Sequence, residues 1–381
     1  MSVIQYLRAR TRLWGAAGLW AGILLIAFDL YAAAVTYIPQ YQVRNDFRLI
    51  YGAALTALRD GYSHLYDLSA QKAAVEGLGP GFYWSPFLNP PPLVWLATPF
   101  TLLPFNAAII LWTALLVAAA LLTWYLAAPG GRLTRAAHLA LWLGLFPVAF
   151  GLMVGQPVAL VAAAVAASWW LAARNRPVLA GLALSAIAIK PQAALLVPLC
   201  LLVSGHARMF GSWLVATGVM VLVVLAALGP DGLNRYRDVL SLASQWEPTR
   251  RYAVAGPLGL GPQIYVVQAI VVATAVVAAW RHRHAGVEVP IAAGITASLL
   301  FTPYVGFQDF AMLVVAGWLV LRAQPSRLQL SVLVVGYALL ELALLVLAVP
   351  ILLSEALLLA SFVWKPPDMQ SIPASDSGMR V

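Results

Sequence analysis

Residues 105–127 read FNAAIILWTALLVAAALLTWYLA, a continuous stretch of 23 residues that contains no charged side chain. A helix that spans a bilayer needs about 20 mostly apolar residues, so this stretch predicts a transmembrane helix. Similar apolar stretches recur at roughly 13–37, 137–152, 157–173, 210–228, 263–280, 289–301, 309–321, 329–349 and 351–364. The sequence therefore predicts an all-α polytopic membrane protein, a bundle of about 10–12 transmembrane helices.

The overall composition supports this class. Of the 381 residues, 62% are hydrophobic and 10% are charged, whereas soluble domains carry about 25% charged residues. The net charge of +9 comes from small basic clusters between apolar stretches, which indicate membrane topology rather than a nucleic-acid surface. The one cysteine, Cys200, lies inside an apolar stretch, so the sequence offers neither a disulfide nor a thiolate metal site. We expect one transmembrane domain over 1–364, with a first external loop at 38–90 and a polar tail at 365–381.

Basic residues predict the orientation, because short loops rich in Lys and Arg stay in the cytoplasm. One topology places all basic clusters inside: 88–104 is half-inserted or interfacial, and 178–203 reaches the outer face and returns. The residues placed inside are Arg8, Arg10, Arg12, Arg132, Arg135, Arg174, Arg176, Arg208, Arg281, Arg283, Arg322 and Arg327. The same topology places the polar segments outside, namely 45–67, 155–156, 190–192, 229–262 and 302–309. Sequence leaves open whether 88–104 and 178–203 cross fully, since the first is rich in proline and Lys190 interrupts the second.

The segment 45–67, NDFRLIYGAALTALRDGYSHLYD, is charged and rich in tyrosine, and it follows the first apolar stretch. Its apolar residues recur at three- and four-residue spacing as far as Gly61, a residue typical of a helix end. We expect an amphipathic helix along the membrane surface. From spacing alone, Asn45 or Asp46 has the ordinary role of capping this helix. Its polar side is expected to carry Arg48, Thr56, Arg59 and Asp60.

Five motifs follow one another along the chain. They are D-F-x-x-x-Y-(x9)-G-(x4)-Y-D from residue 46, PFLNPPPL from residue 86, Gly-Gln at 155–156, A-G-L-(x7)-K-P-Q from residue 180 and T-P-Y-(x4)-D from residue 302. Each motif is loose, but their order and spacing together resemble the GT-C glycosyltransferases of family 87. The resemblance runs from about residue 13 to 321, which is nearly the whole bundle.

The resemblance implies a GT-C-like fold whose first external loop contains juxtamembrane helices. It also implies that an acidic residue near the start of this loop acts as the catalytic base, and the matching position is Asp46. The implied donor is a polyprenyl phosphate that carries a hexose, with mannose as the expected sugar, and no cofactor or metal is required. The sequence agrees, since it has no Gly-rich phosphate loop and no D-x-D pair. Displacement of a β-linked donor would give an α-linked product.

Transfer from a polyprenyl phosphate needs a base for the acceptor hydroxyl and cationic groups for the phosphate. Lys190 is the first candidate for the phosphate, because a lysine within an apolar stretch is costly without an anionic partner. The alternative is that Lys190 extends to the membrane interface. Arg250 and Arg251 are the second candidates, because a guanidinium binds phosphate through two hydrogen bonds, and the alternative is a solvated pair of loop residues.

The substrate-binding candidates are polar residues of the predicted external segments: Tyr51, His64, Gln156, Gln192, Gln308 and Asp309. Each has an ordinary structural alternative. His64 is also explained as an interfacial packing residue, the glutamines as bridges between helices, and Asp309 as a carboxylate at a helix N-terminus. Some family members carry a histidine in the loop that corresponds to 302–309, and this chain has none there; His64 is the candidate to compensate, with interfacial packing as its ordinary role.

The sequence thus predicts an integral-membrane hexosyltransferase that transfers its sugar to a lipid or glycan acceptor at the external face of a bacterial plasma membrane. A membrane transporter or lipid flippase is the alternative, because it would use the same kind of bundle with buried charges. A structured external loop with an amphipathic helix favours the enzyme, whereas repeat symmetry and a charge relay across the membrane would favour transport.

Overall fold

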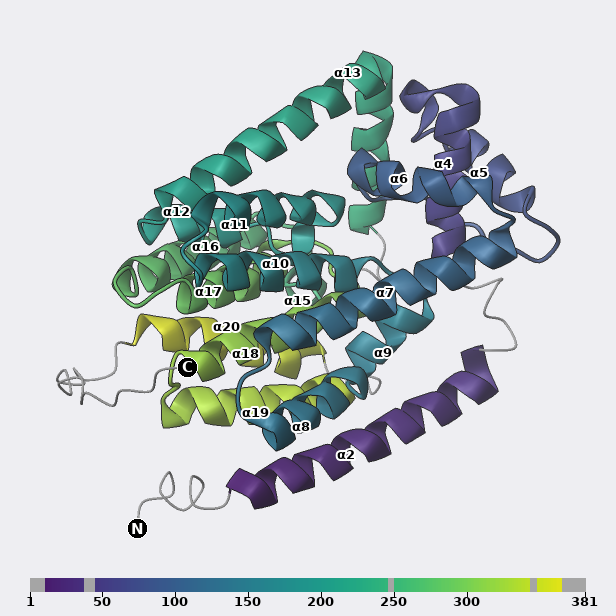
Figure 1. The fold of residues 1–381 in the computed structure, drawn as a ribbon. Helices are drawn as coiled ribbons and strands as arrows, with labels where there is room; N and C mark the ends of the chain where they lie inside the picture. Colours follow the sequence, from purple (N-terminus) through teal and green to yellow (C-terminus); the bar gives the residue numbers. More distant parts are fainter. Residues whose placement is uncertain (1–10, 38–44, 246–249, 343–347, 365–381) are drawn as a thin grey trace, which may run out of the picture.

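The computed structural model describes residues 11–37, 45–245, 250–342 and 348–364. Every regular element in these residues is a helix (Figure 1), which confirms the all-α class. Arg8, Arg10 and the expected polar tail at 365–381 lie outside the described residues.

Four of the described helices are long and apolar enough to span a bilayer, which confirms a polytopic membrane protein. They are α2 (Thr11–Ala32), α7 (Phe105–Ala127), α13 (Ala207–Gln245) and α16 (Gln263–Arg281). Helix α13 bends at Gly229, which has a φ of 60° and precedes Pro230, a residue without a backbone N–H. The expected number of about 10–12 spans depends on shorter helices and stays a prediction.

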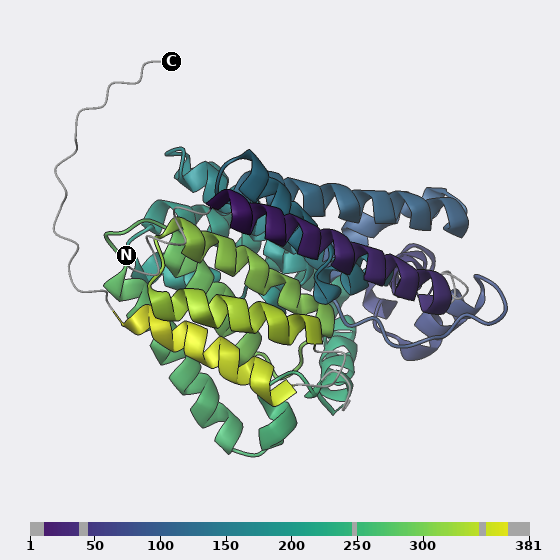
Figure 2. The ribbon, with the colours of Figure 1, turned by 90° about the horizontal axis from the view of Figure 1, so that it is seen from below.

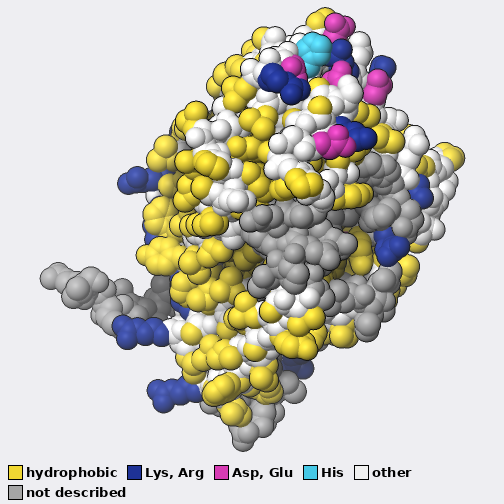
Figure 3. All heavy atoms as spheres, turned by 90° about the vertical axis from the view of Figure 1, so that its right-hand side faces the viewer, with side chains coloured by type: hydrophobic (Ala, Val, Ile, Leu, Met, Phe, Trp, Pro, Cys, Tyr) yellow, Lys and Arg dark blue, Asp and Glu magenta, His cyan; other side chains and the backbone are white. Residues whose placement is uncertain are grey.

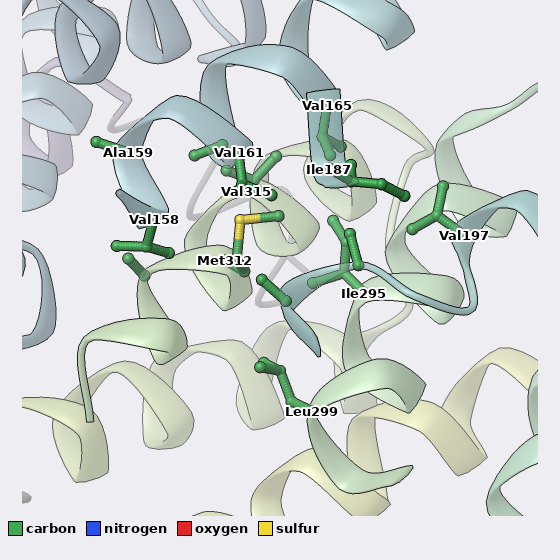
Figure 4. Packing of buried hydrophobic residues seen from close by; sticks show 14 of the residues in the cluster. Val158, Ala159, Val161, Val165, Ile187, Val197, Ile295, Leu299, Met312 and Val315 are labelled. Atoms are coloured by element: carbon green, nitrogen blue, oxygen red, sulfur yellow. The ribbon is translucent and has the colours of Figure 1, made fainter. Parts of the chain in front are cut away.

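Shorter helices complete the bundle: α8 (Arg132–Leu143), α9 (Phe146–Met153), α10 (Val158–Ala172), α11 (Pro177–Leu184), α12 (Val197–Val203), α17 (Glu288–Phe301), α18 (Ala311–Arg322), α19 (Arg327–Glu341) and α20 (Ala348–Val363). Helix α17 is apolar on all sides and is buried along most of its length, as expected for a central helix. Figure 4 shows Ile295 and Leu299 of this helix in the same packed cluster as Val161 of α10 and Met312 of α18. The core therefore holds together the helices whose ends carry the polar segments.

Helix α2 lies at the edge of the bundle beside α8 (Figures 1 and 2). Glycines on α2 permit this close approach, because a Cβ at Gly22 would lie 2.5 Å from the backbone of Ala140. Small residues that let backbones approach are typical of helix pairs in membranes.

The apolar stretch predicted at 137–152 is two helices, since α8 and α9 meet at an angle of 58°. Pro147 in the first turn of α9 lacks an N–H and is compatible with a helix start but not with a helix interior. The Phe146 N–H at this new N-terminus donates to the Glu341 carboxylate of α19, over 3.0 Å. A side chain from another helix thus satisfies a donor that the break leaves free.

The segment 178–203 turns back at Lys190, as the basic-residue pattern predicts. Helix α11 and the short 3₁₀ turn η5 (Ser185–Ile189) lead to Lys190, and η6 (Pro191–Ala193) and α12 lead back. Helix α12 runs antiparallel to α17, because the Leu196 N–H donates to Ser298 and Val197 lies against Gly294. Lys190 is therefore at the tip of a hairpin inside the bundle.

The first loop folds into short helices, α4 (Phe47–Asp60), η3 (Tyr62–His64), α5 (Leu68–Glu76), α6 (Pro91–Ala97) and η4 (Thr98–Leu102). Helix α4 packs against α5 and α6 and runs across the direction of α7 (Figure 1). The proline-rich segment 88–104 is thus a short helix and a 3₁₀ turn that pack on α4, and not a regular span.

Two of the four residues predicted for the polar side of α4 are buried instead. Arg59 and Asp60 are exposed and paired, but Arg48 and Thr56 are buried. Thr56 donates its hydroxyl to the Gly52 carbonyl, and Arg48 donates to the carbonyls of Asn45 and Tyr83. Backbone carbonyls supplied by the fold satisfy these side chains, so helical periodicity alone did not identify their environment.

Basic and polar segments lie at opposite ends of the bundle. At one end Arg135 donates to the Ala128 carbonyl, Arg322 to the Ala127 carbonyl and Arg281 to the Val363 carbonyl. Figure 3 looks at the other end, where charged side chains gather in the upper part of the view. The surface pairs Arg59–Asp60 and Lys72–Glu76 of the first loop belong to that end.

Candidate active site

The start of α4 is fixed by Asn45. Its side-chain oxygen accepts the Phe47 N–H over 2.9 Å, and its amide donates to the Met153 carbonyl at the end of α9, also over 2.9 Å. The Asp46 N–H donates to the Val154 carbonyl over 2.8 Å, while the Asp46 side chain makes no capping hydrogen bond to α4. Capping therefore explains Asn45 but leaves the Asp46 carboxylate available for another role.

The Asp46 carboxylate is held on one side and accessible on the other. Gln156 Nε2 donates to Asp46 Oδ2 over 2.6 Å. Arg48 Nη1 lies 3.7 Å from Asp46 Oδ1, which is too long for a hydrogen bond, and the Asp46 side chain is 33% exposed. Oδ1 thus keeps lone pairs that can accept a proton.

Burial raises the pKa of the Asp46 carboxyl, whereas the hydrogen bond from Gln156 and the charges of Arg48 and Lys190 lower it. Burial is the largest of these effects, so the pKa lies above that of an ordinary aspartate. A carboxylate with a raised pKa is a stronger base at neutral pH.

Gln156 connects Asp46 to a buried ion pair. Lys190 Nζ donates to Gln156 Oε1 over 2.9 Å and lies 2.5 Å from Asp309 Oδ1. Lys190 and Asp309 are 3% and 1% exposed, and Asp309 Oδ2 accepts the Gly306 N–H over 3.0 Å. Because Lys190 occupies the oxygen of the Gln156 amide, the NH₂ group of that amide must face Asp46.

Gly155 allows this arrangement. Its φ is +73°, and a Cβ at this position would lie 2.4 Å from the Asn45 side-chain oxygen. Its carbonyl accepts the indole N–H of Trp112 over 2.8 Å, which anchors the turn to α7. The Gly-Gln pair is therefore a tight turn that brings Asn45 close while presenting Gln156 to Asp46.

A model of glycosyltransferase family 87 matches residues 87–303, more than half of the 381-residue chain. The chain belongs to glycosyltransferase family 87. It is accordingly a membrane glycosyltransferase that uses a sugar donor and an acceptor. Gln156 and Lys190 lie within the matched residues, whereas Asp46 precedes them and Asp309 follows them. Neither the curated proteins nor the solved structures that were compared with the chain give a significant match.

The structure thus brings together four residues that the sequence predicted for the glycosyltransferase site, Asp46, Gln156, Lys190 and Asp309. Tyr51 is not directed into this group. It is buried, donates its hydroxyl to the Leu103 carbonyl over 2.8 Å, and packs edge to face against Phe47 and Phe105. These contacts give Tyr51 a packing role.

Arg250 and Arg251 lie at the same end of the molecule. They precede Tyr252, whose ring lies 5.5 Å from Phe307 and 5.9 Å from Phe310, on either side of Asp309 in the chain. This packing brings the two arginines to the 302–309 stretch.

The remaining candidates are partly buried. Gln192 follows Lys190 at the tip of the hairpin, and Gln308 precedes Asp309, with its Cβ near Gly151. His64 Nδ1 lies 3.5 Å from Arg235 Nη1, which donates to the Ser63 carbonyl over 2.7 Å. His64 thus joins the first loop to the bent part of α13.

The sequence analysis missed Asn45 as an anchor and Arg48 as a buried neighbour of Asp46. A signal was present, because Asn, Asp and Arg stand within four residues at the start of an apolar helix. Within the described ranges, no group of three or more His, Cys, Asp or Glu side chains is arranged to hold a metal ion.

Proposed function

We propose that this glycosyltransferase transfers a hexose, with mannose as the expected sugar, from a polyprenyl-phosphate donor to a lipid or glycan acceptor, with Asp46 as general base. The observation that carries the proposal is the geometry of the Asp46 carboxylate. Oδ2 is held by Gln156, Oδ1 keeps its lone pairs, and the side chain is one-third exposed.

In the proposed reaction, an acceptor hydroxyl lies against Asp46 Oδ1 and loses its proton to it as the oxygen attacks the anomeric carbon. The bond between this carbon and the donor phosphate oxygen breaks, and the phosphate leaves with the electron pair. Attack opposite to the leaving group inverts the anomeric centre, so a β-linked donor gives an α-linked product. The amide of Gln156 keeps Oδ1 directed toward the acceptor.

The leaving phosphate gains charge and needs cationic partners. We assign this role to Arg250 and Arg251, whose loop packs on the 302–309 stretch through Tyr252. Lys190 is the second candidate, because Asp309 already balances its charge and Gln156 already accepts a hydrogen bond from it. Gln192, Gln308 and His64 are the proposed contacts for sugar or acceptor hydroxyls.

A lipid-linked donor fits the position of the site. Asp46 and Gln156 lie beside the ends of α9 and α10, in a bundle of which four described helices are long and apolar enough to span a bilayer. A polyprenyl chain in the bilayer would carry its phosphate and sugar to this level without leaving the membrane. The site resides, in this proposal, at the external face of a bacterial plasma membrane.

The direct test uses purified protein in nanodiscs that contain polyprenyl-phosphate [¹⁴C]mannose and a mixed lipid and glycan acceptor extract. We expect labelled product from this donor and none from a nucleoside-diphosphate mannose. Transfer only from the nucleotide sugar would refute the lipid-linked donor. Transfer only from polyprenyl-phosphate glucose would replace mannose by glucose as the transferred sugar. A flippase would move the donor across vesicles without forming product.

Orientation has its own test. In a variant without the buried Cys200, a cysteine at Ser63 should react with an impermeant thiol reagent in intact cells, and one at Ala285 should not. The reverse labelling pattern would place Asp46 on the cytoplasmic side.

A further inference from the structure

A second polar feature lies inside the bundle, away from Asp46. Helices α8, α18, α19 and α20 line a half-open cavity of about 360 Å³. Its walls are mainly apolar and include Trp142, Trp318 and Leu333. Cavities of about 300–1,000 Å³ are the usual size of small-molecule sites, and no residue of the Asp46–Gln156–Lys190–Asp309 group lines this one.

Glu355 of α20 lines the cavity. Its side chain is buried at 2% exposure, and neither carboxyl oxygen has a hydrogen-bond partner among the described residues. Two other polar side chains of the wall already have partners, because His138 accepts the indole N–H of Trp318 over 3.2 Å and Tyr337 donates its hydroxyl to the Leu141 carbonyl over 2.8 Å. A buried carboxyl without a partner costs free energy, and an ionisable residue inside a membrane bundle is a candidate for function.

We infer that this cavity binds a membrane-soluble alcohol, an uncharged molecule with an apolar chain and one hydroxyl group. The apolar walls fit the chain, and the hydroxyl supplies the hydrogen bond that Glu355 lacks. The cavity lies between helices of a membrane bundle, so a ligand would enter it from the surrounding lipid. The ligand must therefore be lipophilic. A charged head group fits poorly, because the walls offer too few polar groups to replace its hydration.

The site is distinct from the transferase site. Glu355 is at mid-helix in α20, and its neighbour Ser354 lies close to Gly336, in the second half of α19. A bound alcohol would therefore lie within the span of these helices, whereas Asp46 stands at the end of the bundle. The inference does not depend on the proposed donor.

The test is photolabelling of the full-length protein in nanodiscs with a dodecanol that carries a diazirine on its chain. The matching diazirine dodecane, which lacks the hydroxyl, is the control probe. We expect the alcohol to label peptides of α19 and α20 above those of the lipid-facing α13, and above labelling by the alkane. Excess unlabelled dodecanol should compete.

Variants of Glu355 separate recognition from packing. Glu355→Gln keeps an acceptor oxygen and should retain labelling, whereas Glu355→Leu should lower labelling by the alcohol about 10-fold, which corresponds to 1.4 kcal/mol. Leu333→Trp, which fills the cavity, should abolish labelling by the alcohol. Thermal unfolding of each variant checks the fold, and the competition experiment on the unmodified protein does not depend on any variant.

Two outcomes would overturn the inference. One is equal labelling of α19, α20 and α13 by the alcohol without competition, which would mean contact with bulk lipid only. The other outcome is that the carboxyl does not recognise the hydroxyl. Either equal labelling by alcohol and alkane, or unchanged labelling by the alcohol in a folded Glu355→Leu protein, would show this.

Discussion

Replacing Asp46 by Asn should lower sugar transfer by about 10²-fold or more, the usual scale of general base catalysis. Asn has the size of Asp and its oxygen can accept the hydrogen bond from Gln156, but it cannot take a proton from the acceptor. A loss of 10²-fold corresponds to about 2.7 kcal/mol in the activation barrier. Stability should fall by about 1–3 kcal/mol, because the buried Arg48 loses the attraction of this carboxylate over 3.7 Å while it keeps its hydrogen bonds to two carbonyls. The cap of α4 is not affected, since the Asp46 side chain does not form it.

Asp67 provides a matched control in the same loop. Its carboxylate accepts the N–H groups of Ser69 and Ala70 at the start of α5, so it is a true capping residue. Asp67→Asn should preserve both stability and transfer, because Asn caps as well as Asp. Asp67→Ala should lower the free energy of unfolding by about 1 kcal/mol without changing turnover per folded molecule.

The assay measures initial rates with polyprenyl-phosphate mannose at saturation, together with thermal unfolding and donor binding. Near-normal transfer by a folded Asp46→Asn protein would refute the assignment of the base. Equal loss of transfer in Asp46→Asn and Asp67→Asn would show that the assay reports on the integrity of the loop, and not on proton transfer.

The other predictions concern the groups behind Asp46. Gln156→Leu removes a hydrogen bond that lowers the pKa of Asp46, so the acid limb of the pH–turnover profile should move to higher pH; an unchanged limb would contradict the contact. Lys190→Gln leaves Asp309 buried without its cation and should destabilise the protein by about 3–5 kcal/mol, while Lys190→Met with Asp309→Leu should recover much of this. In that folded double variant, a lower kcat at constant donor KM supports positioning of Gln156, whereas a higher donor KM supports direct phosphate contact by Lys190. Gly155→Ala should destabilise the protein by about 1–3 kcal/mol in thermal unfolding, because φ is positive and the added Cβ would meet Asn45; unchanged stability would contradict the tight turn.

Hydrophobic stretches predicted the helices well, because the bilayer requires apolar length whatever the tertiary contacts are. The turn at Lys190 agrees with the topology in which the basic residues on both sides of 178–203 lie at the same end, while the sequence alone left open a full crossing. Polar environments were less predictable. Helical periodicity predicts an exposed Arg48, but Arg48 is buried. Its burial is tolerated because the carbonyls of Asn45 and Tyr83 accept hydrogen bonds from its guanidinium. The Asn45 carbonyl is local, but the Tyr83 carbonyl comes from a loop whose position no local pattern specifies.

The same reasoning applies to the candidate site. Sequence identified Asp46, Gln156, Lys190 and Asp309 one by one, each with an ordinary alternative, but it did not predict that Lys190 pairs with Asp309 rather than remaining open for phosphate. That pairing depends on two loops separated by more than 100 residues. A cation next to a buried carboxylate is already neutralised, so we favour a positioning role for Lys190, and its contact with phosphate stays a prediction.

A buried ion pair is weak evidence for stability, since the cost of removing two charges from water offsets most of their attraction. The contribution of this ion pair is instead to fix the orientation of neighbouring side chains. Asp309 is oriented by the Gly306 N–H, Lys190 is oriented by Asp309, and Lys190 decides which end of the Gln156 amide faces Asp46. A neutral residue of the same size at position 190 would leave the Gln156 amide held by Asp46 alone, so its orientation and position would be less firmly fixed. The ion pair therefore explains why a lysine stands inside an apolar hairpin: it holds a hydrogen-bond donor, rather than an acceptor, against Asp46.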